Sequence, residues 1–233
     1  MQTGRGMCKI HLLYEDNHLL VVEKPPNMLT QSDSTGDDDL LSALKENIRI
    51  RYNKPGNVYL GLVHRLDRPV GGAMVFAKTS KAAARLSEQI RKNELDKQYL
   101  AVVFGRPEKP SGTLVNFLSK DEATNTVRVV DGTEVGKKAS LEYKVLDFSQ
   151  GMSLIKIKLH TGRSHQIRVQ LSAIGHPLYG DQKYGRGLNK PGMQLALWSV
   201  EIGFMHPTLK QFQSYKSVPP DIYPWNLFNA KYL

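Results

Sequence analysis

The sequence predicts an α+β protein built on a largely antiparallel, mixed β-sheet flanked by helices. Three observations predict this class: segments with strand-like alternation are many, segments with helical periodicity are few, and the breaks between strands have hairpin length. The 233 residues contain no linker, internal repeat or low-complexity tract. We therefore expect a single domain, 1–233, built either as one unit or as two fused lobes.

The N-terminal part of the chain predicts a strand pair and then a helix. The segment "IHLLYEDNHLLVVEKP" predicts two short strands around a turn at 15–17, and its prolines end the second strand. After a polar loop at 31–39, "LLSALKENIRIRY" predicts a helix over 40–52. Either Asp38 or Asp39 is suited to cap this helix, because a carboxylate oxygen accepts the free amides of a first turn.

A buried strand and a second helix are expected next. The apolar segment "GGAMVFAKT" predicts a strand over 71–79, and "SKAAARLSEQIRK" predicts a helix over 80–92 with Thr79 or Ser80 as its cap. The apolar face of this helix is expected to hold Ala83, Leu86 and Ile90.

The C-terminal half is mostly strands. The stretch "GRSHQIRVQLSAIG", 162–175, is the exception, because Ile167, Leu171 and Ile174 have helical spacing and Gly175 suits a helix end. The strands expected in this half are 97–105, 113–118, 126–130, 138–148, 153–160, 194–204 and 211–219.

Charge and cysteine content restrict the class of partner and the compartment. The chain has 32 Lys and Arg against 22 Asp and Glu, a formal net charge of +10 that favours nucleic acid as partner. Its one cysteine, Cys8, allows no internal disulfide and no cysteine-based zinc site, which fits a reducing compartment such as the cytoplasm. No segment is long and apolar enough to cross a membrane, and the N-terminus does not read as a secretory signal.

The segment "HRLDRPVGG", 64–72, places an acid between two arginines after an apolar stretch. A strand–loop–strand junction of this kind can present Asp67 from a rigid scaffold. Arg65 and Arg68 would lower its pKa, and a permanently ionised carboxylate suits a nucleophile or a base better than an acid. The simpler interpretation, a surface ion pair of little energetic value, is about equally good on this stretch alone.

Two further segments carry reactive side chains. In "LDKQYL" a strand would place Lys97 and Tyr99 on the same face, although a buried structural tyrosine is the simpler interpretation. In "HTGRSHQIRVQL", His160, Arg163, His165 and Arg168 gather where a helix is expected to begin, and the free amides of such an end attract phosphate. The histidine spacing and the lack of a carboxylate between them exclude a metalloprotease site.

At this point the chain resembles the RluA-type pseudouridine synthases. The three segments "HRLDRPVGG", "KQYLAVVFG" and "HTGRSHQIRVQLSAIGHPLYGDQKYG" resemble three motifs of that family, in the same order, and the resemblance covers roughly residues 9–218. Asp67 and Tyr99 lie 32 positions apart (99 − 67), similar to the family. One departure is that many members have Thr-Ser-Gly at the positions where this chain has Val-Gly-Gly, residues 70–72. No room is seen for the extra N-terminal RNA-binding domain that some members carry.

The resemblance implies a pseudouridine synthase fold with a central cleft and a role for each motif residue. The reaction would convert uridine in ribosomal or transfer RNA to pseudouridine, by a monomeric enzyme without cofactor or metal. Asp67 would be the catalytic carboxylate, Arg168 its salt-bridge partner, and Tyr99 the residue that stacks on uracil and helps remove the carbon 5 proton. Arg65 would fill the space left by the flipped base.

The remaining assignments from the resemblance concern substrate contacts. His64, Arg163 and His165 are the further candidates for binding the RNA. The glycines at 71 and 72 are expected to let the backbone pass close to the ligand.

Two other classes of function share some of these features. A non-catalytic RNA-binding or chaperone protein would have the same charge but would not need Asp67 and Tyr99 at this spacing. A glycosidase or nucleoside hydrolase would normally need a carboxylate pair or a metal, and the acids of the loop "GDDD" are more simply explained as solvated.

Overall fold

The computed structural model describes residues 10–132, 136–185 and 187–232, and Cys8 therefore lies outside the described part. The strands are β1 (His11–Glu15), β2 (Leu19–Lys24), β3 (Gly61–Leu62), β4 (Gly71–Ala77), β5 (Asp96–Phe104), β6 (Ser111–Asp121), β7 (Thr126–Val130), β8 (Lys137–Ser149), β9 (Met152–Leu159), β10 (Leu197–Met205) and β11 (Phe212–Lys216). The helices are α1 (Leu40–Arg51), α2 (Ser80–Arg91) and α3 (Gln166–Ala173), followed by the 3-10 turns η1 (Trp225–Leu227) and η2 (Ala230–Tyr232).

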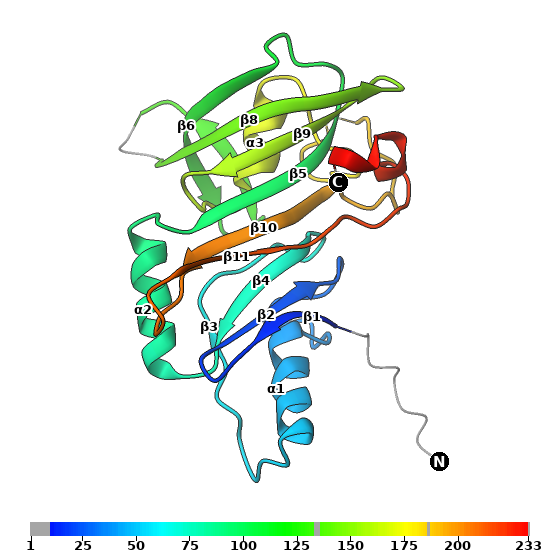
Figure 1. Ribbon diagram of the computed structural model, residues 1–233. Coiled ribbons are helices and arrows are strands. Elements are labelled where there is room, and N and C mark those ends of the chain that lie inside the picture. The colour runs from blue at the N-terminus through cyan, green and yellow to red at the C-terminus, as the bar shows by residue number, and fades with distance from the viewer. Residues whose placement is uncertain (1–9, 133–135, 186, 233) are drawn as a thin grey trace.

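All of these strands belong to one mixed sheet (Figure 1). Its main path runs β1-β2-β4-β10-β5-β9-β8-β6-β7, with β11 paired to β10 and β3 paired to β4. Within the described residues, β10 and β4 pair in parallel and the other strand pairs are antiparallel. The α+β class and the largely antiparallel sheet are therefore confirmed. The short strand β3 was not predicted.

Side chains cover both faces of the sheet. Along β5, Tyr99, Ala101 and Val103 belong to the main core, into which α1 and α3 pack. Leu100 and Val102 point to the opposite face and pack with the C-terminal turn η1. This alternation has the period of two expected of a strand, and it places Tyr99 on the same face as α3.

Local hydrogen bonds explain where the first two helices begin. The Asp39 side chain accepts the Ser42 amide at 2.9 Å, and the Thr79 hydroxyl accepts the Ala82 amide at 3.2 Å. Of the alternative caps, these two are therefore the ones used. The predicted apolar face of α2 packs against the core: Leu86 is buried and Ala83 and Ile90 are partly buried there, while Ala82 and Gln89 beside them are buried as well.

The predicted helix over 162–175 is too long at its start. The helix begins at Gln166, and His165 before it has a left-handed backbone with φ of 51°. The Gln166 side chain accepts hydrogen bonds from the Thr161 hydroxyl at 2.8 Å and from the Arg163 amide at 3.1 Å. These bonds hold the preceding residues in a loop, and that loop carries the polar residues of the third motif into the pocket described below.

The glycine pair at 71 and 72 lets two strands approach each other. A Cβ at Gly71 would lie 2.2 Å from the Trp198 ring, and a Cβ at Gly72 would lie 2.3 Å from the Ser199 carbonyl oxygen. Gly72 also has a φ of +114°, which side chains rarely adopt. The interpretation that these glycines serve the ligand is thus wrong: they seat β4 against β10, where the two halves of the sheet meet.

Candidate active site

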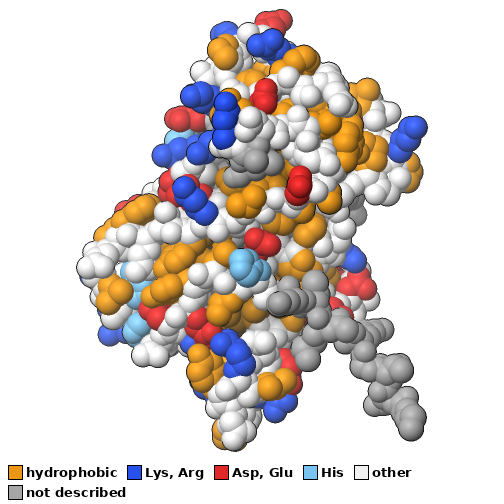
Figure 2. Space-filling view, turned by 45° about the vertical axis from the view of Figure 1, so that its right-hand side comes forward, with side chains coloured by type: hydrophobic (Ala, Val, Ile, Leu, Met, Phe, Trp, Pro, Cys, Tyr) orange, Lys and Arg blue, Asp and Glu red, His pale blue; other side chains and the backbone are white. Residues whose placement is uncertain are grey.

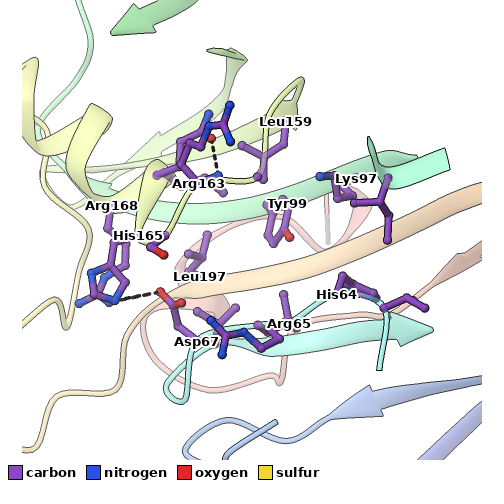
Figure 3. Close-up of a pocket in the computed structure, with 18 of the residues that line it drawn as sticks. His64, Arg65, Asp67, Lys97, Tyr99, Leu159, Arg163, His165, Arg168 and Leu197 are labelled. Carbon is purple, nitrogen blue, oxygen red and sulfur yellow. Dashed lines mark hydrogen bonds and ion pairs between the residues drawn. The ribbon is translucent and has the colours of Figure 1, made fainter. Parts of the chain in front are cut away.

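The seven residues to which the resemblance assigned a role line one pocket of about 810 Å³ on the α3 face of the sheet (Figure 3). They are His64, Arg65, Asp67, Tyr99, Arg163, His165 and Arg168. The loop before β4 supplies the first three, β5 supplies Tyr99, and the loop and first turn of α3 supply the rest. Tertiary packing therefore brings together segments that lie up to 104 positions apart in the chain (168 − 64).

The Asp67 carboxylate faces α3, not its neighbours in sequence. Its Oδ2 lies 3.4 Å from Nη1 of Arg168 and 3.8 Å from Nε2 of His165, and the side chain keeps 32% exposure. Arg68 turns away and pairs with Asp37 at 2.7 Å. Pairing of Asp67 with Arg168 is thus present as the resemblance implied, and the interpretation that the flanking arginines hold the acid is wrong for Arg68.

Arg168 is shared between two carboxylates. Its Nε and Nη2 each donate to Asp181 at 2.8 Å, a two-point contact that is shorter than the contact with Asp67. Asp181 is fully buried and also accepts the backbone amides of Lys183 and Tyr184. Arg168 is therefore oriented from behind by Asp181, and only its remaining edge faces Asp67.

Tyr184 holds the other two groups that approach Asp67. Its ring lies under the Arg168 guanidinium at 5.0 Å, and its hydroxyl oxygen accepts the Val127 amide at 2.8 Å. The hydroxyl hydrogen is then available to His165 Nδ1, 2.7 Å away. If that hydrogen is donated to Nδ1, the imidazole hydrogen is on Nε2, which faces Asp67 at 3.8 Å. Burial lowers the pKa of His165, which favours the neutral ring, while the nearby Asp67 charge acts in the opposite direction.

A buried lysine braces the loop that carries Asp67. Lys24 is fully buried, and its Nζ donates to the carbonyls of Pro25 at 2.9 Å, Met28 at 2.6 Å and Arg68 at 3.0 Å. Burial lowers the pKa of Lys24 to about 7, and the Asp67 charge opposes this shift. The bond to Arg68 ties the chain immediately after Asp67 to the segment that follows β2.

Tyr99 and Lys97 form the floor of the pocket on β5. Burial and the Asp67 charge raise the pKa of Tyr99, so its hydroxyl remains protonated in the free protein. Lys97 lies two residues along the same strand face, and burial lowers the pKa of its amine. The shared strand face that the sequence indicated for these two residues is therefore present.

The other predicted residues differ in how free they are. His64 Nε2 accepts the Val75 amide at 3.0 Å, and burial lowers its pKa to about 3, so it is a neutral ring tied to β4. Arg65 is exposed at the pocket edge, and Arg163 donates to the Lys138 carbonyl at 3.0 Å. His160, which the sequence grouped with them, pairs with Glu142 at 2.9 Å outside the pocket lining.

Comparison with known proteins places this pocket in a family. The sequence profile of the RNA pseudouridylate synthase family matches residues 18–173. The chain is 35% identical over 202 residues to an uncharacterised RNA pseudouridine synthase of Bacillus subtilis, and the match covers 85% of this chain and 65% of the relative. The chain belongs to the RNA pseudouridylate synthase family. The match includes Asp67, Tyr99 and Arg168 of the pocket.

Other members of the pseudouridylate synthase family agree in sequence and in fold. The ribosomal large subunit pseudouridine synthase D of Zymomonas mobilis is 33% identical over 224 residues, covering 91% of this chain and 70% of that protein. The solved structure of human RNA pseudouridylate synthase domain containing 4 superposes with a TM-score of 0.76 at 22% identity, over 90% of this chain and 88% of that one. The chain thus spans about two thirds of the length of the curated relatives it matches, and the solved structure supports the fold.

The electrostatics of the pocket suit a polyanion. Its lining contains one carboxylate, that of Asp67, and five Lys and Arg side chains: Arg65, Arg91, Lys97, Arg163 and Arg168. On the face in Figure 2, hydrophobic side chains cover much of the middle, and many of the Lys and Arg side chains lie toward the upper left. Within the described ranges, no group of three His, Cys, Asp or Glu side chains has the arrangement of a metal site, and no helix is long and apolar enough to cross a membrane.

Sequence reasoning missed the residues that orient the pocket from behind. Asp181 and Tyr184 lie in the third motif, "GHPLYGDQKYG", but no role was assigned to them, because neither periodicity nor spacing indicates which residue faces Arg168. Lys24 ends a predicted strand and gave no signal beyond its charge. The one signal that could have pointed to Asp181 and Tyr184 is that they lie in the same motif as Arg168.

Proposed function

We propose that this protein isomerises specific uridines of structured RNA to pseudouridine, with Asp67 as the essential group. The observation that carries this proposal is the placement of one ionisable carboxylate, held by Arg168, in a cationic pocket whose floor is an aromatic ring. A hydrolase is less well supported, because the pocket lining contains a single carboxylate and Asp181 is buried behind Arg168. A passive RNA-binding protein would not need this arrangement.

In the proposed reaction the bond between C1′ of the ribose and N1 of uracil breaks, and the electron pair remains on the ring. Asp67 either forms an ester bond to C1′, which breaks when carbon 5 bonds to C1′, or removes the C2′ proton to give a glycal and returns that proton to C2′ when carbon 5 bonds to C1′. The detached uracil turns on the Tyr99 ring and rejoins C1′ through carbon 5. The carbon 5 proton then leaves and N1 takes up a proton, so that no atoms are gained or lost overall.

The neighbouring residues bind and orient the substrate. Arg168 and neutral His165 hold Asp67 on one side, so that its exposed edge faces the sugar. Arg65, exposed at the pocket edge, occupies the gap that the flipped uridine leaves in the RNA. Arg163 contacts phosphate, which makes binding sensitive to salt. His64 contributes by shaping the wall, because its Nε2 is already bonded to the backbone.

The wider setting belongs to the same proposal. The RNA is ribosomal or transfer RNA, the catalytic unit is the sheet with its helices, and the protein works as a monomer in the cytoplasm without cofactor or metal. Support for an RNA substrate comes from the family and from the cations of the pocket.

The test is to map pseudouridines in total RNA from cells with and without the gene, and then to treat the RNA from the deletion strain with purified protein. We expect one or a few positions to lack pseudouridine in the deletion strain and to be restored by the wild-type protein but not by Asp67→Asn. An RNA whose pseudouridines are identical in both strains and unchanged by the protein would contradict the proposed function.

A further inference from the structure

Lys97 is a cation of the pocket for which the protein supplies no partner. Within the described residues, no carboxylate or carbonyl oxygen lies within hydrogen-bond or ion-pair distance of its Nζ. By contrast Lys24, the other lysine buried at this site, donates to three carbonyls. A partly desolvated amine without a partner loses free energy, so such an amine in a pocket is arranged for something that arrives with the substrate.

The walls of the pocket fix where this amine lies. A Cβ on Gly162 would lie 3.3 Å from Nζ, so the amine passes directly beneath the loop before α3. On the opposite wall the Lys97 charge contributes to the lowered pKa of His64. The amine therefore lies between the two walls, on the same strand face as the Tyr99 ring.

Asp67 and Lys97 lie toward opposite ends of the pocket, with Tyr99 between them (Figure 3). The charges agree with this order. Asp67 contributes to the raised pKa of Tyr99, whereas burial alone accounts for the lowered pKa of Lys97. Among the described residues Asp67 forms its ion pair with Arg168, and no ion pair joins it to Lys97.

A uridine placed on this frame has a defined direction. Its C1′ must lie at Asp67, where the proposed reaction takes place, and its ring must lie over Tyr99. Because O4 of uracil lies opposite N1 across the ring, it points away from the sugar. The O4 atom is then the part of the base that reaches the Lys97 end of the pocket.

We propose that Lys97 donates a hydrogen bond to O4 of the target uracil, and that this contact both selects uridine and stabilises the detached base. This inference rests on the proposed function. Cytidine carries an amino group in place of O4. Two donors, this amino group and the Lys97 amine, would then face each other without an acceptor, so the site rejects cytidine. When the C1′–N1 bond breaks, the electron pair left on the ring is delocalised onto O2 and O4, and a donor at O4 stabilises that anion.

The test combines a protein change with an atomic change in the substrate. Lys97→Met removes the donor and keeps the length of the side chain, and the substrate is an oligonucleotide with the mapped uridine tritiated at carbon 5. In matched oligonucleotides sulfur, a weak acceptor, replaces either O4 or O2 of that uridine. Single-turnover release of tritium into water measures the reaction. Lys156→Met, on an exposed position of β9 outside the pocket lining, is the control.

We expect Lys97→Met to lower kcat/KM about 10- to 100-fold on the natural oligonucleotide, as for a hydrogen bond to a charged group. Sulfur at O4 should slow the wild-type protein and Lys156→Met, but should slow Lys97→Met no further. Sulfur at O2 should slow all three proteins by the same factor. Thermal unfolding checks that the variants are folded, and Lys97→Leu, which also lacks a donor, replaces Lys97→Met if that variant is not.

Three outcomes would overturn the assignment. An unchanged kcat/KM for Lys97→Met would show that the amine contacts nothing important. Full sensitivity of Lys97→Met to sulfur at O4 would show that the amine contacts another atom. A loss confined to KM, with a salt dependence smaller by about one ion, would identify Lys97 as a phosphate contact. Failure of the proposed function is distinguishable from all three outcomes, because the wild-type protein would then release no tritium. The role assigned to Lys97 would be contradicted in that case too.

Discussion

The two ends of the pocket differ in how their charges are satisfied. At the Asp67 end three charged groups have protein partners: Arg168 contacts both Asp67 and Asp181, and Lys24 donates to three carbonyls. At the Lys97 end the amine has no such partner among the described residues, although it is also partly desolvated. The difference indicates that the first end is organised before the substrate binds, whereas the second is completed by it.

Asp67→Asn should have the largest effect, because it removes the one carboxylate that lines the pocket. We expect a loss of at least about 10⁴-fold in single-turnover rate, with RNA binding and thermal stability little changed. Asp37→Asn, which removes a more exposed acid that pairs with Arg68, is the control. Turnover by Asp67→Asn above the level of contaminating wild-type protein would remove Asp67 from the reaction.

Tyr99→Phe tests the role of the hydroxyl of Tyr99, the residue that lies between the two ends of the pocket. The ring should still bind the base, but loss of the hydroxyl should slow the release of tritium from carbon 5 by about 10²-fold. Tyr143→Phe serves as the control, because Tyr143 is also buried and faces the same β9 residue, Ile157, from the other side. A wild-type rate for Tyr99→Phe would leave the ring with a stacking role alone.

Asp181→Asn removes the buried support of Arg168. The guanidinium would keep only its longer contact with Asp67, so we expect about a 10²-fold loss in kcat with KM nearly unchanged. Breaking a buried pair should also lower the free energy of unfolding by about 3 kcal/mol. Chemical denaturation measures the second effect, and Asp221→Asn, an exposed position, is the control. If stability falls while kcat in the folded fraction is unchanged, Asp181 has no positioning role.

Arg65→Ala should have a smaller effect that depends on the substrate. With this variant, a uridine that is stacked in a helix should react about 10-fold more slowly than with the wild-type protein. The rate for a uridine that is already unstacked should fall less, because flipping it costs less free energy. Arg68→Ala, in the same loop but paired with Asp37, controls for charge. Equal losses on both substrates would leave Arg65 as a phosphate contact.

Lys24→Met tests the organised end through stability, without RNA. The pKa of Lys24 is about 7 in the folded protein against 10.5 for an ordinary lysine, so between these values the unfolded chain binds more protons. The free energy of unfolding should therefore rise with pH in this window, by up to about 1.4 kcal/mol per pH unit from this group. Denaturation between pH 7.5 and 9.5 should show that contribution in the wild-type protein and in Lys156→Met, but not in Lys24→Met. Parallel pH profiles for all three would place the pKa of Lys24 near its ordinary value.

Much of this protein was predictable from local patterns. Alternation and apolar runs predicted most of the strands, and the cap residues Asp39 and Thr79 were among the expected alternatives, because these signals depend on neighbours in the chain. The order of three motifs likewise brought Asp67, Tyr99 and Arg168 to attention before any contact was known. Each of these signals lies within a few residues of the feature it predicts.

What the tertiary structure alone decided is which groups face one another. Adjacency in sequence suggested Arg68 as a neighbour of Asp67, but the loop turns its side chain toward Asp37. The glycines beside it serve the β4–β10 contact, and Asp181 stands behind Arg168 although 114 positions separate it from Asp67 (181 − 67). Two charges that are distant in sequence pair only because the folded sheet brings them together. A side chain's partner is set by packing in space, so no periodic pattern in the sequence indicates it.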